Sequence, residues 1–250
     1  MVIEIINKHI YLLFILFSLK GQSQPISTEY FIGLWEPADN HKYDIKRLVM
    51  QTDSGYQIKD YRKNEKLKFE GLFSSINPVV EHGHFSFYGK KGKLEAEGNY
   101  VNGVLTGTWN FYNEDGSLKK EVDYSFPQRV CEPLDKAERE LILNSIDSIR
   151  TESVPVYPGT NTNAMYQFIY EHLVYPPLAS MYFKSGKVVV KFKIDVQGDV
   201  CNVYAEAGMD KDLELETRRV ISLLSKWTPG MVNGIPVMVE MTCPITFSFQ

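Results

Sequence analysis

The stretch 175–249 restricts the possible folds more than any other part of the chain. Tyr175-Pro176-Pro177 ends a preceding helix, because prolines donate no amide and push the residue before them out of the α region. An alternating strand over 188–196 and a turn at Gly198-Asp199 then lead into a second strand. A helix over 212–226 and a last strand over 235–249 complete the order. This succession predicts an α+β domain with an antiparallel three-stranded sheet and two helices.

The apolar residues of these elements fall on one side. Along Val188–Val196 apolar side chains alternate with Lys191, Lys193 and Asp195, as in a sheet with one dry face. Two helices are expected to cover that face. Their apolar positions recur at helical spacing, as Met165, Phe168, Ile169 and Leu173 in the first and Leu213, Val220, Ile221, Leu224 and Trp227 in the second.

The middle of the chain repeats itself. Gly83–Tyr88 matches Gly107–Tyr112, and the glycine, leucine, glutamate and tyrosine that follow recur at the same spacing. A weaker copy runs from Tyr61 to Phe73, where Glu65 replaces the turn glycine. Each unit reads as a β-hairpin with an aromatic first strand, so stacked copies predict an antiparallel β meander. The shared apolar face is expected to contain Phe85, Phe87, Leu94, Trp109, Phe111 and Leu118.

This pattern resembles MORN-type repeats, which are also described as antitoxin-like in bacteria. The resemblance covers about residues 55–125. It implies a hairpin fold and says little about function. The aromatic residues of the repeats are expected to pack in the core, and contact with a partner is the alternative.

The C-terminal part resembles the C-terminal domain of the energy transducer TonB, over about residues 154–250. The motifs that carry the resemblance are Tyr175-Pro-Pro-Leu-Ala, Gly186-Lys-Val-Val-Val-Lys-Phe-Lys-Ile-Asp, Gly198-Asp-Val, Lys226-Trp-Thr-Pro-Gly, Asn233-Gly-Ile-Pro-Val and Pro244-Ile-Thr-Phe. The resemblance implies a periplasmic α+β domain that grips the TonB box of outer-membrane receptors. It also implies force from an inner-membrane proton-driven motor, which would require a retained membrane anchor.

Pro244 lies inside the last strand and predicts how such a grip would form. A proline inside a strand is normally confined to a sheet edge, with its nitrogen facing away from the neighbouring strand. An open edge can add an extended peptide by β-augmentation. The expected partner-binding residues are Tyr175, Pro176, Met238, Glu240, Thr242, Pro244 and Thr246. The alternative is that the connecting helix or a second copy of the chain covers this edge.

The first 23 residues read as an export signal. Lys8 precedes an apolar run over 10–19, and small residues at Gly21 and Ser23 suit cleavage after Ser23. About ten apolar residues are fewer than the roughly 20 that a spanning helix needs. The alternative is an uncleaved anchor, which would place Glu4 and Lys8 at membrane depth.

These readings divide the chain into residues 1–23 as signal peptide, 24–125 as repeat domain, 126–153 as helical linker and 154–250 as TonB-like domain. The linker helix is expected over Leu134–Ile149 from the spacing of its apolar residues. The full fold expectation is α+β, a TonB-like domain after a β meander.

The three cysteines, Cys131, Cys201 and Cys243, cannot all pair within the chain. Cys201 and Cys243 fall in phase with buried strand positions, which favours two small buried side chains. A Cys201–Cys243 disulfide is the alternative, because an exported compartment allows disulfides to form. No partnering histidine is evident for a catalytic thiolate.

Composition and motifs indicate a binding protein without cofactor. The net charge of -4 and the scattered Lys and Arg residues argue against nucleic acid as a partner. His82 and His84 lack the third or fourth ligand that zinc prefers, so no metal site is expected. No catalytic motif is present, so an enzyme is not expected. The sequence therefore predicts a periplasmic TonB-like peptide-docking protein linked to outer-membrane transport. The alternative is a structural repeat protein whose C-terminal domain forms a homodimer.

Overall fold

The computed structural model describes residues 24–132, 136–137, 139–140, 152–159, 163–206 and 210–249. The predicted signal peptide and most of the predicted helix over Leu134–Ile149 lie outside these ranges. Within them, no helix combines the length and the apolar character that crossing a bilayer requires.

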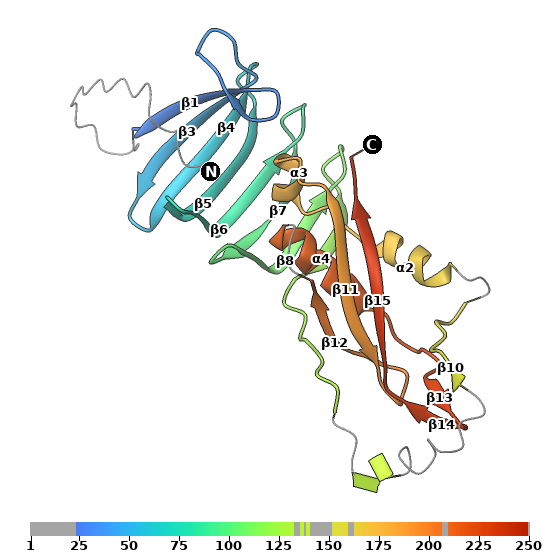
Figure 1. The fold of residues 1–250 in the computed structure, drawn as a ribbon. Helices are drawn as coiled ribbons and strands as arrows, with labels where there is room; N and C mark the ends of the chain where they lie inside the picture. The colour runs from blue at the N-terminus through green and yellow to red at the C-terminus, as the bar shows by residue number, and fades with distance from the viewer. Residues whose placement is uncertain are drawn as a thin grey trace.

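A nine-stranded antiparallel sheet forms the N-terminal half of the described chain, in the order β2-β1-β3-β4-β5-β6-β7-β8-β9 (Figure 1). From β3 to β9 each strand pairs with the next one along the chain, so this part of the sheet is the predicted meander, while β1 lies between β2 and β3. The strands are β1 Ser27–Ile32, β2 Glu36–Pro37, β3 Ile45–Thr52, β4 Gly55–Arg62, β5 Leu67–Ile76, β6 Val79–Tyr88, β7 Leu94–Val101, β8 Val104–Tyr112 and β9 Leu118–Asp123.

Three hairpin turns of the meander share one hydrogen-bond pattern. One turn residue has a positive φ in each case: 61° at Glu65, 81° at Gly92 and 92° at Gly116. Each of these residues donates its amide to the carbonyl three positions earlier, at 2.8 to 2.9 Å. Glu65 therefore occupies the same turn position as the two glycines, and the weak first copy has the register of the later ones.

Aromatic side chains fill the core of the meander. Phe69, Phe85, Tyr100 and Trp109 are all 0% exposed, and their rings contact one another. Phe87 is also buried, whereas Phe111 and Leu94 are only partly buried. Leu118 is 54% exposed, so its predicted place in the core is wrong. It lies on β9, the last strand of the sheet, where no further hairpin covers it.

The C-terminal part has the predicted α+β composition with one more helix than expected. Its main sheet has the order β12-β11-β15, and a smaller sheet has the order β10-β13-β14. The helices are α2 Ala164–His172, α3 Pro177–Met181 and α4 Lys211–Ser222. The strands are β10 Glu152–Ser153, β11 Gly186–Ile194, β12 Val200–Ala205, β13 Gly230–Val232, β14 Ile235–Val237 and β15 Val239–Phe247. The predicted final strand over 235–249 is thus two strands, because β14 returns onto β13 through the Asn233-Gly234 turn.

Two of the motifs quoted above meet in space. The Trp227 amide donates to the Gly198 carbonyl at 3.0 Å, and a Cβ on Gly198 would lie 1.9 Å from the Trp227 carbonyl oxygen. Only glycine fits there, and its φ of 84° also favours glycine. Trp227 itself is 5% exposed and packs beside Phe192. The β11–β12 turn is therefore fixed to the chain that follows α4.

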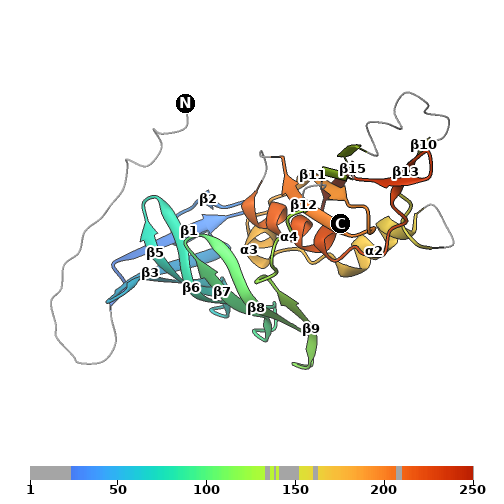
Figure 2. The ribbon, with the colours of Figure 1, turned by 90° about the horizontal axis from the view of Figure 1, so that it is seen from below.

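Helices α3 and α4 lie between the meander and the three-stranded sheet, as both views show (Figures 1 and 2). Leu178 and Met181 of α3 are buried in the aromatic core of the meander. Their neighbour Ala179 belongs instead to the core of the C-terminal sheet. The short helix therefore has apolar contacts on both sides, and the two halves share a buried interface.

Candidate docking edge

Strand β15 lies at the edge of the three-stranded sheet. It pairs with β11 alone among the described strands, in register from Gly186↔Phe247 to Ile194↔Val239 without a bulge. Figure 1 shows these two long strands side by side, with the small sheet at one end and the meander at the other. The opposite edge of β15 carries no strand from the described residues.

The direction of the backbone amides follows from two observations. Pro244 faces Val189, and the Val189 carbonyl accepts from the Glu206 amide at 2.9 Å, on the β12 side. Val189 and Pro244 are therefore a non-hydrogen-bonded pair, and the backbone polar groups of Pro244 point away from β11. Because direction alternates along a strand, the amides of Glu240, Thr242 and Thr246 point to the open edge as well.

The structure gathers most of the predicted partner-binding residues along this edge. Glu240, Thr242, Pro244 and Thr246 are exposed on β15. Met238 is half-buried just before the strand, and Tyr175 is half-buried with its ring 5.4 Å from that of Phe247 at the other end. Pro176 is different, because it is buried at the start of α3. It is the N-cap residue of α3.

The other edge of the sheet is sealed by residues that follow the meander. The Asn202 amide of β12 donates to the Arg129 carbonyl at 2.8 Å, and the Asn202 side chain accepts from the Cys131 amide at 3.1 Å. The Arg129 guanidinium also lies 2.7 Å from Oδ2 of Asp195, a carboxylate that is 4% exposed. The segment 129–131 is thus held against β12 by backbone, side-chain and ionic contacts.

A disulfide between Cys131 and Cys201 completes this seal. The expectation that Cys201 is an unpaired buried residue is therefore wrong, and so is the alternative Cys201–Cys243 bridge. Cys131 comes within reach of Cys201 only because the linker lies along β12, a contact between residues far apart in sequence. Sequence patterns also gave no sign that Arg129 and Asn202 would anchor the linker.

Cys243 is the remaining cysteine and is buried as a free thiol. Burial raises its pKa to about 11, and a hydrogen bond with Tyr166 opposes this shift only in part. A thiol that stays protonated at neutral pH is a poor nucleophile. Cys243 therefore acts as the small buried residue that the strand pattern predicts.

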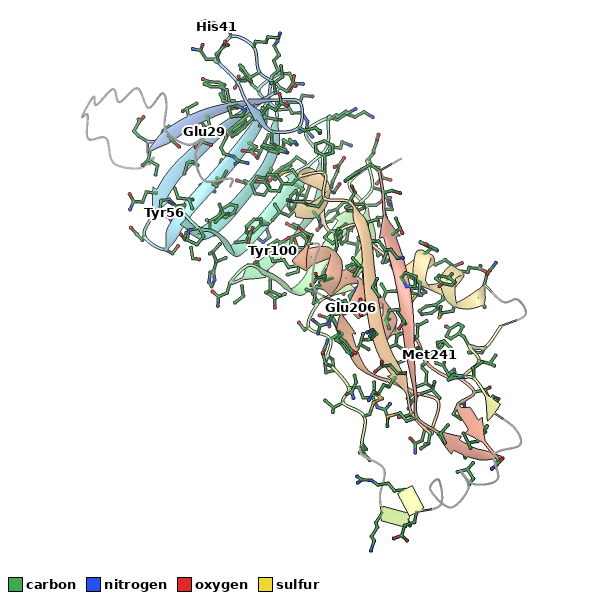
Figure 3. All side chains as sticks on the ribbon, in the orientation of Figure 1. Glu29, His41, Tyr56, Tyr100, Glu206 and Met241 are labelled. Carbon is green, nitrogen blue, oxygen red and sulfur yellow. A yellow bond between two sulfur atoms is a disulfide. The ribbon has the colours of Figure 1, made fainter. Side chains whose placement is uncertain are left out.

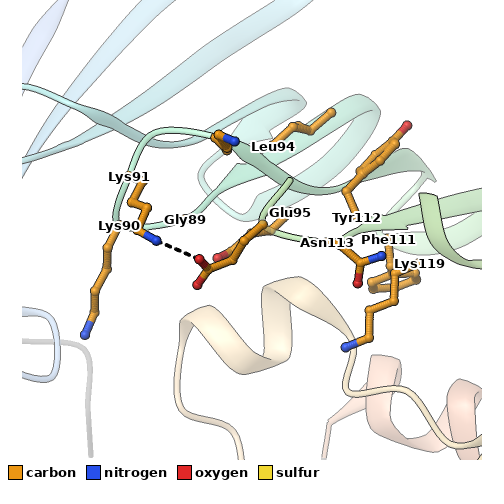
Figure 4. A pocket seen from close by; sticks show the side chains of 11 residues that line it. Gly89, Lys90, Lys91, Leu94, Glu95, Phe111, Tyr112, Asn113 and Lys119 are labelled. Atoms are coloured by element: carbon orange, nitrogen blue, oxygen red, sulfur yellow. Dashed lines mark hydrogen bonds and ion pairs between the residues drawn. The ribbon is translucent and has the colours of Figure 1, made fainter. Parts of the chain in front are cut away.

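Two adjoining hollows lie beside the meander, and one of them also borders α3. One has a volume of about 520 Å³ and lies between the β6–β7 and β8–β9 turns, where Lys90, Lys119 and Phe111 are among the residues that line it (Figure 4). The other has a volume of about 350 Å³ and lies between the meander and α3. Glu95 and Phe111 line both.

No metal centre is present in the described part of the chain, where no three His, Cys, Asp or Glu side chains come together as ligands. His84 instead lies 3.5 Å from Glu97, and His82 bonds to Asn102. Glu97 also accepts from the Tyr112 hydroxyl. These side chains bond to one another on the surface of the meander.

Comparison with known proteins gives one match. No curated protein and no solved structure matches the chain. A protein-family model does match, and it covers most of the C-terminal part, from the end of α2 to the residues after β15. Residues 171–249 of the chain thus match the family described as Gram-negative bacterial TonB protein C-terminal.

Proposed function

We propose that the chain binds an extended peptide of an outer-membrane receptor along the open edge of β15, in TonB-dependent transport. The observation that carries the proposal is the edge position of β15, with the backbone of Pro244 and the amides of Thr242 and Thr246 directed outward. The match of residues 171–249 to the TonB C-terminal family supports a TonB-like role in outer-membrane transport.

The other sheet edges of the described chain are poorer templates for pairing. Strands β2 and β10 have two residues each and β14 has three, and β9 carries Lys119, Lys120, Glu121 and Asp123. Short strands and charged side chains both discourage strand addition. The edge of β12 is occupied by residues 129–131. Strand β15 offers the longest run of outward amides without such protection.

The proposed location is the periplasm, where the receptor peptide would be accessible. Coupling to an inner-membrane proton-driven motor belongs to the proposal only if residues 1–23 stay attached as an anchor. N-terminal sequencing of the exported protein decides this point. A start near Gln24 argues against direct force transmission, and an intact Met1 in the membrane fraction favours it.

The test replaces one outward amide. Thr242→Pro removes the donor from the open edge and leaves the ladder with β11 in place, because the Thr242 amide faces outward. We expect the full-length variant to bind a receptor TonB-box peptide at least tenfold more weakly in titration calorimetry. Thr242→Val keeps the amide and is expected to bind like the wild type.

Hydrogen exchange gives a second readout on the unmodified protein. Saturating peptide is expected to slow exchange of the amides of Glu240, Thr242 and Thr246. Unchanged exchange at all three residues, together with full binding by Thr242→Pro, would contradict the proposal. Homodimerisation through β15 is the competing function. It would protect the same amides without peptide, in proportion to protein concentration, and sedimentation would detect the dimer.

A further inference from the structure

The hollow between the meander and α3 lies at the C-terminal end of the docking edge. Its volume is about 350 Å³, and it is lined by Arg62, Lys68, Phe87, Phe111, Tyr175, Phe183 and six neighbouring residues. An elongated peptide on β15 that continued past Phe247 would meet this hollow next. Its walls come from both halves of the chain, so it exists only in the assembled fold.

A row of aromatic rings connects the edge to the hollow. The Tyr175 ring lies 5.4 Å from that of Phe247, the last residue of β15, and 4.9 Å from that of Phe249. Phe183 lies 5.6 Å from Phe249 and is 47% exposed. Tyr175 and Phe183 line the hollow as well. The path from strand edge to cavity is therefore continuous and apolar, a surface that favours an apolar side chain.

Two cations give the hollow its charge. Lys68 is half-buried, and its Nζ lies 4.6 Å above the Trp35 ring. Arg62 donates to the carbonyls of Leu67 and Tyr88, at 3.1 and 2.7 Å. Within the described chain neither forms an ion pair with a carboxylate. Glu95 is the one acid in the lining.

These cations are partly removed from water. Burial lowers the pKa of Lys68, with a smaller opposing effect from Asp60, and burial also lowers the pKa of Arg62, with a smaller opposing effect from Glu95. A partly desolvated cation without a carboxylate partner gains more from an incoming carboxylate than a fully hydrated one does. The hollow thus combines apolar walls with two partly buried cations that a carboxylate could pair with.

We propose that this hollow is a second subsite of the docking surface, which takes an apolar side chain and an adjacent carboxylate from the same peptide that pairs with β15. The inference rests on the proposed function and adds a sequence requirement to it. The partner's peptide carries an apolar–acidic pair beyond the segment that pairs with the strand. Lys68 receives the carboxylate, and Phe87, Phe111 and Met181 surround the apolar side chain.

The experiment uses the full chain and two kinds of probe. One is a receptor TonB-box peptide, alone or joined at either end through a short Gly-Ser spacer to Phe-Glu. Both ends are tested because the peptide's direction on β15 is not fixed. The other is N-acetyl-Phe-Glu-amide at millimolar concentration, followed by the methyl signals of Met181 and Ala96, which line the hollow.

Three variants separate the contributions. Lys68→Met removes the charge and keeps the length, and Ser180→Trp fills the hollow from α3. Lys63→Met is the matched control, because Lys63 is an exposed meander lysine that does not line the hollow. The TonB-box peptide alone is expected to bind the wild type and all three variants equally.

The extended peptide is expected to bind the wild type at least tenfold more tightly than the short one. Lys68→Met and Ser180→Trp should abolish this gain, while Lys63→Met keeps it. An extended peptide with no gain at either end, or a gain that survives in Lys68→Met, overturns the subsite. The dipeptide is expected to shift the Met181 and Ala96 methyl signals, and unshifted signals also overturn it. Failure of the short peptide to bind the wild type rejects the proposed function, and any dipeptide shifts would then show a pocket that is separate from peptide docking.

Discussion

The Tyr100 hydroxyl of β7 donates a 2.7 Å hydrogen bond to Oδ2 of Asp212 in α4, and neither side chain is more than 3% exposed. The bond joins the meander to the C-terminal part, and Figure 3 shows Tyr100 on the meander beside α4. Near it, Lys211 forms a 2.8 Å ion pair with Glu81 of β6. The other carboxylate oxygen of Asp212 has no hydrogen-bond partner among the described residues. Loss of the Tyr100 hydroxyl would leave a buried carboxyl group without any bond across the interface.

Tyr100→Phe is therefore expected to lower the free energy of unfolding by about 1 to 3 kcal/mol, the cost of leaving a buried polar group unsatisfied. Urea unfolding of the full chain measures it. Tyr88→Phe is the matched control, since its hydroxyl bonds to the partly exposed Glu70 at 2.7 Å. If Tyr100→Phe lowers the free energy of unfolding no more than Tyr88→Phe does, the interface bond stabilises the fold no more than a partly exposed bond.

Stability should also depend on pH through Asp212. Burial raises its pKa to about 7, against a smaller lowering by the Tyr100 hydrogen bond, and Asp210, Lys211 and Glu81 also act on it. The unfolded carboxyl group has a pKa of about 3.9. Between about pH 4 and 7 the folded chain therefore holds a proton that the unfolded chain releases, so the free energy of unfolding falls as pH rises through this window.

The measurement is the urea midpoint at several values from pH 4 to 8, for the wild type and for Asp212→Asn. The amide cannot titrate and can still accept from Tyr100. We expect the stability of Asp212→Asn to fall much less than that of the wild type as pH rises from 4 to 7. If the urea midpoint fell equally with pH in both proteins, titratable groups other than Asp212 would cause the pH dependence.

The Cys131–Cys201 disulfide spans 70 residues of sequence. Cys131→Ser is expected to destabilise the chain by about 2 to 4 kcal/mol, because cross-links over long loops restrict the unfolded state. Reductant should lower the unfolding midpoint of the wild type and leave that of Cys131→Ser unchanged. Reductant should also lower the unfolding midpoint of Cys243→Ala. An unchanged midpoint in that variant would mean that Cys243 takes part in the disulfide.

Gly98 lies against the buried indole of Trp109. A Cβ at this position would lie 2.2 Å from Trp109 Cδ2, a distance that real contacts do not reach. Gly98→Ala is expected to cost about 1 to 3 kcal/mol by overpacking and to change the Trp109 fluorescence. Asn99→Ala alters the neighbouring exposed position and should have little effect on either signal. If Gly98→Ala left the free energy of unfolding and the fluorescence unchanged, the indole of Trp109 would have to move enough to accommodate the added methyl group.

Local patterns predicted the parts of the fold that depend on neighbours in sequence. The repeat spacing predicted the hairpins, including the turn where Glu65 takes a glycine position, because strand and turn geometry are set within a few residues. Strand alternation predicted the core face of β11, and Pro244 predicted that β15 is an edge. The motifs around Gly198 and Trp227 predicted the TonB-like family to which residues 171–249 match.

Contacts between distant segments could not be predicted in this way. Leu178 and Met181 pack into the meander while Ala179 packs the other way, so a five-residue helix faces two cores and shows no single apolar stripe. The pairing of Cys131 with Cys201 depends on the path of the linker along β12. The hollow beside Tyr175 depends on how α3 docks, which no short motif encodes.

The seal on β12 limits how far the C-terminal sheet can grow. A β-sheet extends into a filament only if each molecule has two free sides, one to receive a strand and one to offer it onward. In this sheet the Arg129 segment takes the place of the second side. In the proposed docking, strand addition at β15 would therefore stop after a single event, and the chain would form discrete complexes and not filaments.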